Sequence, residues 1–148
     1  MTPLDALPQG SGKGTYLLTL RLAESQPITI GRLGTWTLPV GWYVYVGSAF
    51  GSGGLRGRLR HHLTPVHRPH WHIDYLRQAA PVIAIAYAFA DHSVEHEWAA
   101  ALRAFPDAHL PIPRFGASDC RCEAHLFHFD AEPALGGLAN LHISIAQI

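Results

Sequence analysis

The stretch of sequence that decides the fold is GWYVYVGSAFGSGGLRGRLR, residues 41–60, in which a strand pattern passes directly into a helical pattern. Over residues 41–49 the side chains alternate between two faces, and one face carries Tyr43 and Tyr45 beside Gly47. A glycine-rich segment, residues 51–54, then interrupts the alternation. We therefore expect a strand, a short turn and a helix in direct succession.

The predicted helix carries two polar residues where apolar ones are expected. Its positions i, i+3, i+4 and i+7 are occupied by Leu55, Arg58, Leu59 and His62. Arg58 and His62 thus lie one turn apart on the face that carries the leucines, which turns both toward the sheet. Pro65 stops the helix. An inward-facing arginine needs an anion, so this face is a candidate binding site.

Patterns on both sides of this stretch predict the remaining elements. Strands are expected over residues 15–22, 82–89 and 126–129, with a hairpin over 28–38. Helices are expected over residues 70–80 and 94–105, the second capped by Ser93 and ended by Pro106. Together these elements predict a compact α/β (α+β) domain over residues 14–130, with a small mainly antiparallel sheet flanked by helices. Residues 1–13 are expected to form a flexible lead-in, and residues 131–148 a tail of uncertain structure.

Composition predicts one soluble globular domain. The 148 residues are 48% hydrophobic and 15% charged, with a mean hydropathy of +0.07. The longest apolar run, residues 79–90, is interrupted by Pro81 and is too short to span a bilayer. The opening residues lack the basic start and apolar core of a signal peptide, and Cys120 and Cys122 stand too close together for a disulfide framework. We expect a cytoplasmic protein without a membrane partner.

Charge is distributed unevenly although the net charge is zero. Residues 1–78 hold eight Lys and Arg against three Asp and Glu, and the remaining residues reverse this balance. Residues 56–77 combine five arginines and five histidines with Trp71 and Tyr75, a mixture that suits phosphate oxygens and stacked bases. A solvated basic helix is the alternative interpretation. The candidate nucleic-acid contacts in this segment are Arg56, Arg60, His70 and His72.

Several blocks of this sequence resemble the GIY-YIG nuclease superfamily. GTY at residues 14–16 and YVG at residues 45–47 resemble its two tyrosine motifs, and a helix with an Arg and a His four residues later follows. Together with IGRLG, HWHIDYL, FGASDCRC and HLF, these blocks resemble a bacterial and archaeal domain-of-unknown-function branch of that superfamily. The resemblance spans residues 14–129.

The resemblance implies a GIY-YIG domain and a metal-dependent endonuclease that hydrolyses phosphodiester bonds of DNA, including branched or damaged DNA. Tyr16 and Tyr45 match the two motif tyrosines, one of which helps to activate the attacking water. Gly47 lets the backbone approach the substrate closely. Arg58 matches the arginine that holds the scissile phosphate, and His62 matches the histidine one turn later.

The resemblance also implies one divalent metal, Mg²⁺ or Mn²⁺, bound by a glutamate on a later helix. Glu95 and Glu97 compete for this role, because they flank Trp98 on opposite sides at similar angles. The pattern of a glutamate followed three residues later by a large apolar residue favours Glu95, and Glu97 remains the alternate.

One expected residue is missing from its usual place. Many members of the superfamily have an asparagine after the glutamate helix, whereas this chain has only Asn140, in its tail. Ser118 or Asp119 could take that role. The alternative function is therefore a non-catalytic nucleic-acid-binding module with the same fold.

Two further groups of residues could bind a metal. Cys120, Cys122 and His125 offer zinc-type ligands, but the spacing is shorter than the usual C-x2–4-C and no fourth ligand is evident. The run of His70, His72 and Asp74 lies in a predicted helix, where residues two apart face different directions. Packing and local hydrogen bonding are favoured over metal binding for both.

Overall fold

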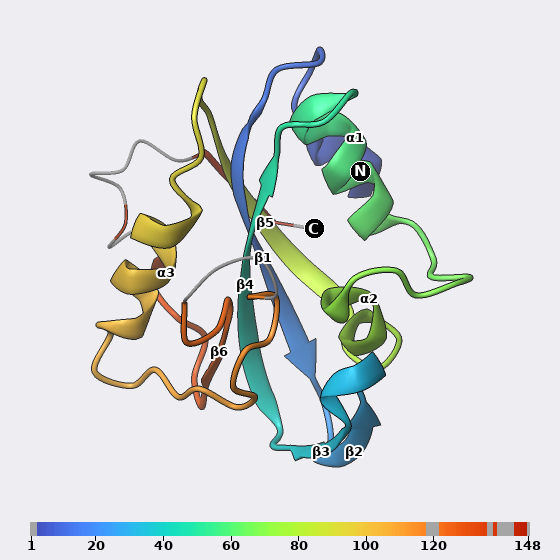
Figure 1. The fold of residues 1–148 in the computed structure, drawn as a ribbon, viewed down its shortest axis with the longest axis vertical. Coiled ribbons are helices and arrows are strands. Elements are labelled where there is room, and N and C mark those ends of the chain that lie inside the picture. The colour runs from blue at the N-terminus through green and yellow to red at the C-terminus, as the bar shows by residue number, and fades with distance from the viewer. Residues whose placement is uncertain (1–2, 118–121, 136–137, 139–143, 148) are drawn as a thin grey trace.

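The computed structural model describes residues 3–117, 122–135, 138 and 144–147, and it contains a five-stranded antiparallel sheet (Figure 1). The strands are in the order β6-β4-β1-β5-β7. Their bounds are β1 (Gly14–Leu22), β4 (Gly41–Ala49), β5 (Val82–Phe89), β6 (Leu126–Phe129) and β7 (Ser144–Gln147). A separate hairpin pairs β2 (Gln26–Thr29) with β3 (Thr35–Leu38). The predicted class, a small antiparallel sheet with flanking helices, is confirmed.

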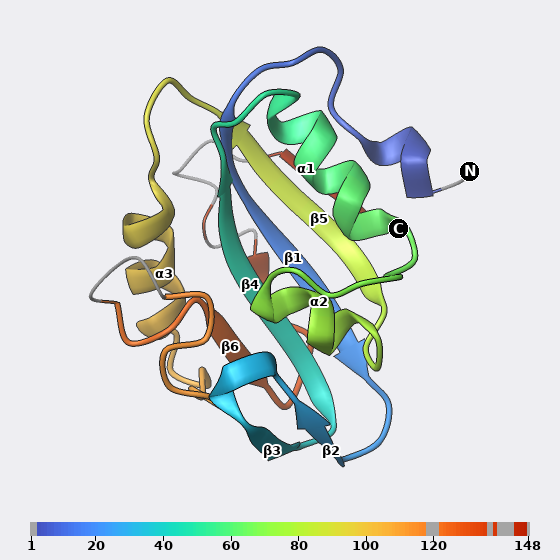
Figure 2. The ribbon, with the colours of Figure 1, turned by 45° about the vertical axis from the view of Figure 1, so that its right-hand side comes forward.

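Helices cover both faces of the sheet. The helices α1 (Gly54–Leu63) and α2 (His72–Arg77) lie on one face, and α3 (Glu95–Arg103) lies on the other (Figure 2). Short 3-10 helices, η1 (Pro3–Ala6) and η2 (Gly31–Leu33), complete the described elements. None of the described helices is long and apolar enough to cross a bilayer.

The sheet separates two cores, which follow from the alternation of side chains in β1 and β4. Even-numbered residues of β1 and odd-numbered residues of β4 face α1 and α2, and we call this cluster the α1-side core. The opposite side chains pack with α3 and form the α3-side core. Trp98 and Phe127 are among its buried members. The predicted faces of residues 41–49 are confirmed.

The segment before β1, which the sequence suggested as a flexible lead-in, makes contacts with α1 and the α1-side core. Leu7 is buried in the α1-side core, and the Arg56 guanidinium donates a hydrogen bond to the Pro8 carbonyl at 3.1 Å. Gly54 has a φ of +60°, and a Cβ there would overlap the backbone of the lead-in at Ser11. The absence of a side chain at Gly54 therefore lets residues 3–13 pack against the start of α1.

Three other boundaries differ from the prediction. The helix α2 is shorter than the predicted 70–80, because it starts only after Trp71 and ends at Arg77. The helix α3 has Val94 rather than Ser93 at its N-cap, although the Ser93 hydroxyl still accepts a hydrogen bond from the Glu95 amide at 3.2 Å. The tail contains β7, which pairs with β5 over Ala84–Tyr87, so the sheet extends beyond residue 130.

The mismatch in length between β6 and β4 leaves an open edge. The strand β6 pairs only with residues 42–45 of β4, and a last backbone hydrogen bond runs from the Val46 amide to the His125 carbonyl at 2.9 Å. Beyond Val46, the described residues give β4 no strand partner on this side. Side chains from both faces of the sheet can therefore meet around Ser48.

Candidate active site

Two tyrosines from neighbouring strands begin the candidate site. Tyr16 on β1 and Tyr45 on β4 both belong to the α1-side core, with ring centroids 6.4 Å apart. Tyr16 pairs with Gly47 across the strands, and a Cβ on Gly47 would overlap the Tyr16 ring. The glycine of the second tyrosine motif thus makes room for the tyrosine of the first. The expected contact of Gly47 with a substrate stays a prediction.

His62 on α1 completes a buried hydrogen-bonded pair with Tyr16. The Tyr16 hydroxyl lies 2.8 Å from His62 Nε2, and the two residues are 1% and 2% exposed. Burial raises the pKa of Tyr16, and the nearby charge of Arg58 only partly opposes this rise. Burial, together with the charges of Arg77 and His61, holds the pKa of His62 well below its usual range. Both groups are therefore uncharged at neutral pH, which makes His62 a possible proton acceptor for Tyr16.

Arg58 points toward the sheet, as the helical spacing predicts. Its Nη1 donates a hydrogen bond to the Ser48 carbonyl at 3.0 Å, and its guanidinium lies over the Trp71 ring, 4.4 Å from the centroid. These contacts leave other guanidinium N–H groups available, because an arginine has five donors. Next to Arg58, a pocket of about 410 Å³ is lined by Arg58, His61, Trp71 and the small residues Ala49, Gly51, Ser52, Gly54 and Gly57.

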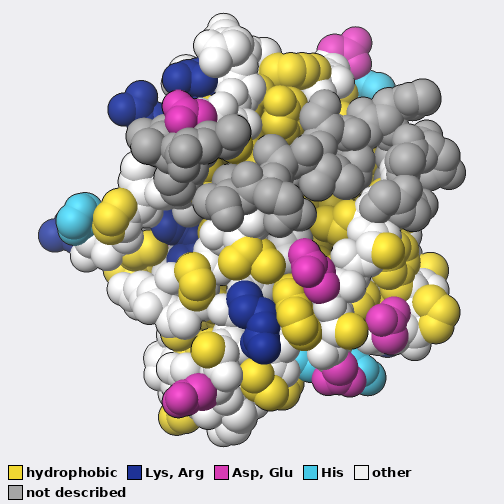
Figure 3. All heavy atoms as spheres, turned by 180° about the vertical axis from the view of Figure 1, so that it is seen from behind, with side chains coloured by type: hydrophobic (Ala, Val, Ile, Leu, Met, Phe, Trp, Pro, Cys, Tyr) yellow, Lys and Arg dark blue, Asp and Glu magenta, His cyan; other side chains and the backbone are white. Residues whose placement is uncertain are grey.

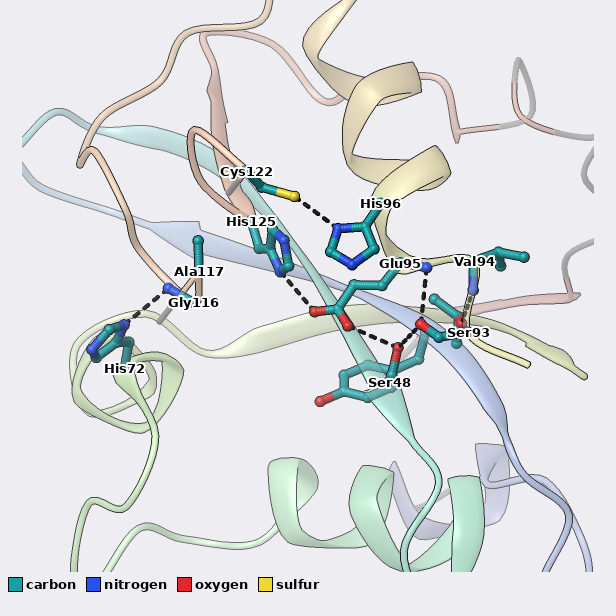
Figure 4. Close-up of polar contacts among 12 residues, drawn as sticks. Ser48, His72, Ser93, Val94, Glu95, His96, Gly116, Ala117, Cys122 and His125 are labelled. Carbon is teal, nitrogen blue, oxygen red and sulfur yellow. Dashed lines mark hydrogen bonds and ion pairs between the residues drawn. The ribbon is translucent and has the colours of Figure 1, made fainter. Parts of the chain in front are cut away.

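Glu95, the first residue of α3, meets the same end of β4 from the opposite face of the sheet. Its Oε2 accepts a hydrogen bond from the Ser48 hydroxyl at 3.0 Å, and its Oε1 lies 2.7 Å from His125 Nδ1 (Figure 4). Burial alone would raise the pKa of Glu95, but the hydrogen bonds and charge of His125 and the Ser48 hydroxyl lower it. Glu95 is therefore a carboxylate at neutral pH.

The two candidate metal ligands, Glu95 and Glu97, have different environments in the structure. The Glu95 side chain is 21% exposed and lies at the β4 edge, whereas Glu97 is exposed on the surface. A charged, partly accessible carboxylate with unused lone pairs fits a hard cation such as Mg²⁺, which often takes only one or two protein carboxylates. The residues present thus fit the metal that the resemblance implies, which Glu95 would hold.

Ser48 is a site residue that sequence reasoning missed. Its carbonyl accepts the Arg58 hydrogen bond, and its hydroxyl contacts Glu95 and lies 2.7 Å from the Ser93 hydroxyl. Ser48 therefore connects the cation of α1 with the carboxylate of α3. A serine at the end of a strand carries no pattern of its own, and only its place after the tyrosine motif could have pointed to it.

The other predicted nucleic-acid contacts are in different environments. Arg60 and His70 are exposed, whereas Arg56 is half-buried in its contact with Pro8. His72 Nδ1 accepts a hydrogen bond from the Gly116 amide at 2.9 Å, and burial lowers the pKa of His72. We conclude that Arg60 and His70 are accessible to a ligand, and that Arg56 and His72 already have structural contacts.

Asp74, the last residue of the H-x-H-x-D run, holds the start of α2. It is fully buried, and its Oδ2 accepts hydrogen bonds from the amides of His70 and Trp71 at 2.9 and 3.0 Å. Its Oδ1 lies 3.1 Å from His61 Nε2. Burial would raise the pKa of Asp74, but these hydrogen bonds lower it.

Four residues singled out in the sequence, Ser118, Asp119, Cys120 and Asn140, lie outside the described residues.

The fold and the site define a small α+β domain with a buried tyrosine–histidine pair, an arginine at its border and a carboxylate across the strand edge. Comparison with protein families assigns it further. The chain belongs to the family described as domain of unknown function DUF123, whose sequence model matches residues 15–145. No curated protein and no solved structure matches the chain.

Proposed function

We propose that this protein is a metal-dependent endonuclease of the GIY-YIG type that hydrolyses phosphodiester bonds in DNA. The observation that carries the proposal is the convergence of five residues from four elements at one end of the sheet. They are Tyr16 of β1, Tyr45 of β4, Arg58 and His62 of α1, and Glu95 of α3. The charges of Arg58 and Glu95 act on both tyrosines, which supports their grouping in one site.

Each side chain has a role that its surroundings support. The proton of the attacking water passes to Tyr16 as the Tyr16 proton passes to His62 Nε2 along the 2.8 Å hydrogen bond. Arg58 binds the scissile phosphate and stabilises the negative charge that develops on it. Glu95 would hold the divalent cation, which supplies Lewis-acid stabilisation of the same phosphate when bound.

The accessible side of α1 and α2 provides the DNA-binding groups. The pocket of about 410 Å³ beside Arg58 offers a cation, an imidazole and an indole ring to a nucleotide. The exposed Arg60 and His70 extend this basic region. On the face seen in Figure 3, most of the visible Lys and Arg side chains lie in the left half, whereas Asp and Glu are spread over the face. The duplex is therefore proposed to lie across α1 and α2.

A nicking assay on supercoiled and branched DNA tests the proposal. The wild-type protein is incubated with Mg²⁺ or Mn²⁺, with EDTA as control, beside the variants Glu95→Gln and Glu97→Gln. We expect metal-dependent cleavage that Glu95→Gln abolishes and Glu97→Gln retains, because only Glu95 lies at the β4 edge. Glu95→Gln should bind DNA as well as the wild type or better, since a negative charge near the phosphate is removed.

Two results would change this conclusion. If the wild-type protein does not cleave DNA with any of the divalent metals, yet binds DNA equally well in EDTA, the nuclease proposal fails and a nucleic-acid-binding module remains. If Glu97→Gln is the inactive variant, the assignment of the metal ligand to Glu95 fails.

A further inference from the structure

A second group of metal-ligand side chains lies beside Glu95, at the start of α3. We propose that His96, Cys122 and His125 bind a zinc-class transition metal ion. This site is separate from the hard-cation site, and its existence does not depend on the proposed nuclease activity.

The three side chains converge although they come from distant parts of the chain. His96 follows Glu95 on α3, and its Nδ1 lies 2.8 Å from Cys122 Sγ, 26 residues later. The ring centroids of His96 and His125 are 5.9 Å apart. One ligand atom from each of the three residues falls within 4.8 Å of the others. Ligand atoms around a tetrahedral zinc ion are separated by roughly 3.3–3.8 Å, so small side-chain movements would complete the geometry, with His96 Nδ1 and Cys122 Sγ moving apart from 2.8 Å.

The chemistry of the set selects the metal. One thiolate and two imidazoles suit zinc and its soft or borderline neighbours, whereas Mg²⁺ and Ca²⁺ prefer oxygen ligands. Cys and His are also the ligands in zinc sites where the protein supplies three ligands and the fourth position is left open. The proposed ion is therefore of a different class from the one proposed at Glu95.

The environment of His125 independently points to a ligand. Its Nδ1 is occupied by the Glu95 carboxylate at 2.7 Å, and the other side of the ring faces Cys122 and His96 (Figure 4). Histidines that bind metals usually donate their second N–H to a carboxylate, which fixes the ring and raises its basicity. The His125 side chain is only 2% exposed, so its orientation is held by packing as well.

A cavity gives an ion access to the fourth position. A pocket of about 310 Å³ is lined by both His96 and Cys122, with Ala99, Arg103 and Phe127 among its other residues. His96 is exposed and Cys122 is half-buried, so the ion can enter from solvent. Water or an external ligand would complete the coordination there. Bound metal would then join α3 to the segment before β6. It would also hold the His125 ring in its contact with Glu95.

Metal content and cobalt spectroscopy of the full chain test this site without any DNA. The protein is stripped with a chelator, loaded with Zn²⁺ or Co²⁺, dialysed and analysed by mass spectrometry. We expect one zinc per chain and, with cobalt, a thiolate-to-metal charge-transfer band with the d–d intensity of tetrahedral coordination. Excess Mg²⁺ should not displace either ion. Wild-type protein that retains no zinc, or a cobalt complex without the thiolate band, would overturn the proposal.

Variants locate the ion. Cys122→Ser should abolish the thiolate band, and His96→Asn should weaken zinc binding by at least tenfold. Glu95→Gln should weaken it by about 10–100-fold through His125. His92→Asn is the matched control, because the His92 side chain is 76% exposed and lies just before α3, so this variant should bind zinc as the wild type does. Equal zinc binding by wild type and by folded Cys122→Ser and His96→Asn, with circular dichroism checking the fold, would place the ion elsewhere and refute the site.

Discussion

The two faces of the sheet differ in what they bury. The α3-side core is built round Trp98, Phe127 and Phe129, and its hydrophobic cluster contains no titratable group. The α1 side buries Tyr16 and Tyr45 together with His62 and Asp74. Burying polar groups costs free energy unless they are hydrogen-bonded, and on this side Tyr16 bonds to His62 while Asp74 accepts two backbone amides. The α3 side thus combines an apolar core with the polar residues Glu95 and His125 at the β4 edge, whereas the α1 side buries its tyrosines and polar groups within the core.

The largest expected effect is on the α3 side. Replacing Trp98 with Ala should lower the free energy of unfolding by about 3–5 kcal/mol, because a fully buried indole leaves a cavity. Chemical denaturation followed by circular dichroism measures the change. A loss well below this range would show that the α3-side core is not the main source of stability.

The next effect separates activity from stability on the α1 side. Replacing Arg58 with Ala should reduce cleavage by about 10²–10³-fold, as expected for a donor that stabilises transition-state charge. Its melting temperature should stay close to that of the wild type, since Arg58 is only half-buried. Arg60→Ala, two residues away and exposed, is the control that should keep nearly full cleavage at saturating DNA, because this change weakens only binding. Unchanged cleavage in Arg58→Ala would contradict the site.

A smaller effect concerns pH. The pKa of His62 is depressed in the fold by burial, so the unfolded chain binds an extra proton below about pH 6.5 and stability falls as the pH falls. In the mildly acidic range, His62→Gln should therefore have a shallower dependence, by up to about 1.4 kcal/mol per pH unit. Denaturant midpoints between pH 7 and pH 5 measure this slope. The exposed His67 provides the control His67→Gln, and equal slopes for wild type and His62→Gln would contradict the buried neutral histidine.

The smallest effect is on DNA affinity. Arg60→Ala should weaken binding modestly and reduce the slope of log K against log salt by about 0.9, which corresponds to one phosphate contact. Fluorescence anisotropy at several salt concentrations gives the slope. If binding by the wild-type protein does not depend on salt, DNA is not the partner of this face.

Local patterns were sufficient for most of the fold, and for the face of α1 that carries the site. The alternation over residues 41–49 and the i, i+4 spacing of Arg58 and His62 depend only on neighbours in the chain. Helical periodicity did not separate Glu95 from Glu97, and the sequence favoured Glu95 only through the family pattern, because the contact that distinguishes Glu95 is with Ser48, 47 residues away. The spacing of Cys120 and Cys122 likewise gave no sign of His96, which approaches from another element. The strand β7 was missed because its four residues show little pattern in the sequence. What defines the strand is its pairing with β5, which is distant along the chain.

The close approach of the Tyr16 ring to Gly47 has a consequence for how these sequences can vary. A methyl group at position 47 would occupy the space of the tyrosine ring, so an alanine there requires a smaller residue at position 16. The reverse change is less restricted, since a smaller residue at position 16 would tolerate either glycine or alanine at position 47. The two tyrosine motifs should therefore covary in one direction: across related proteins, side chains larger than glycine at position 47 are expected only where position 16 has lost its aromatic ring.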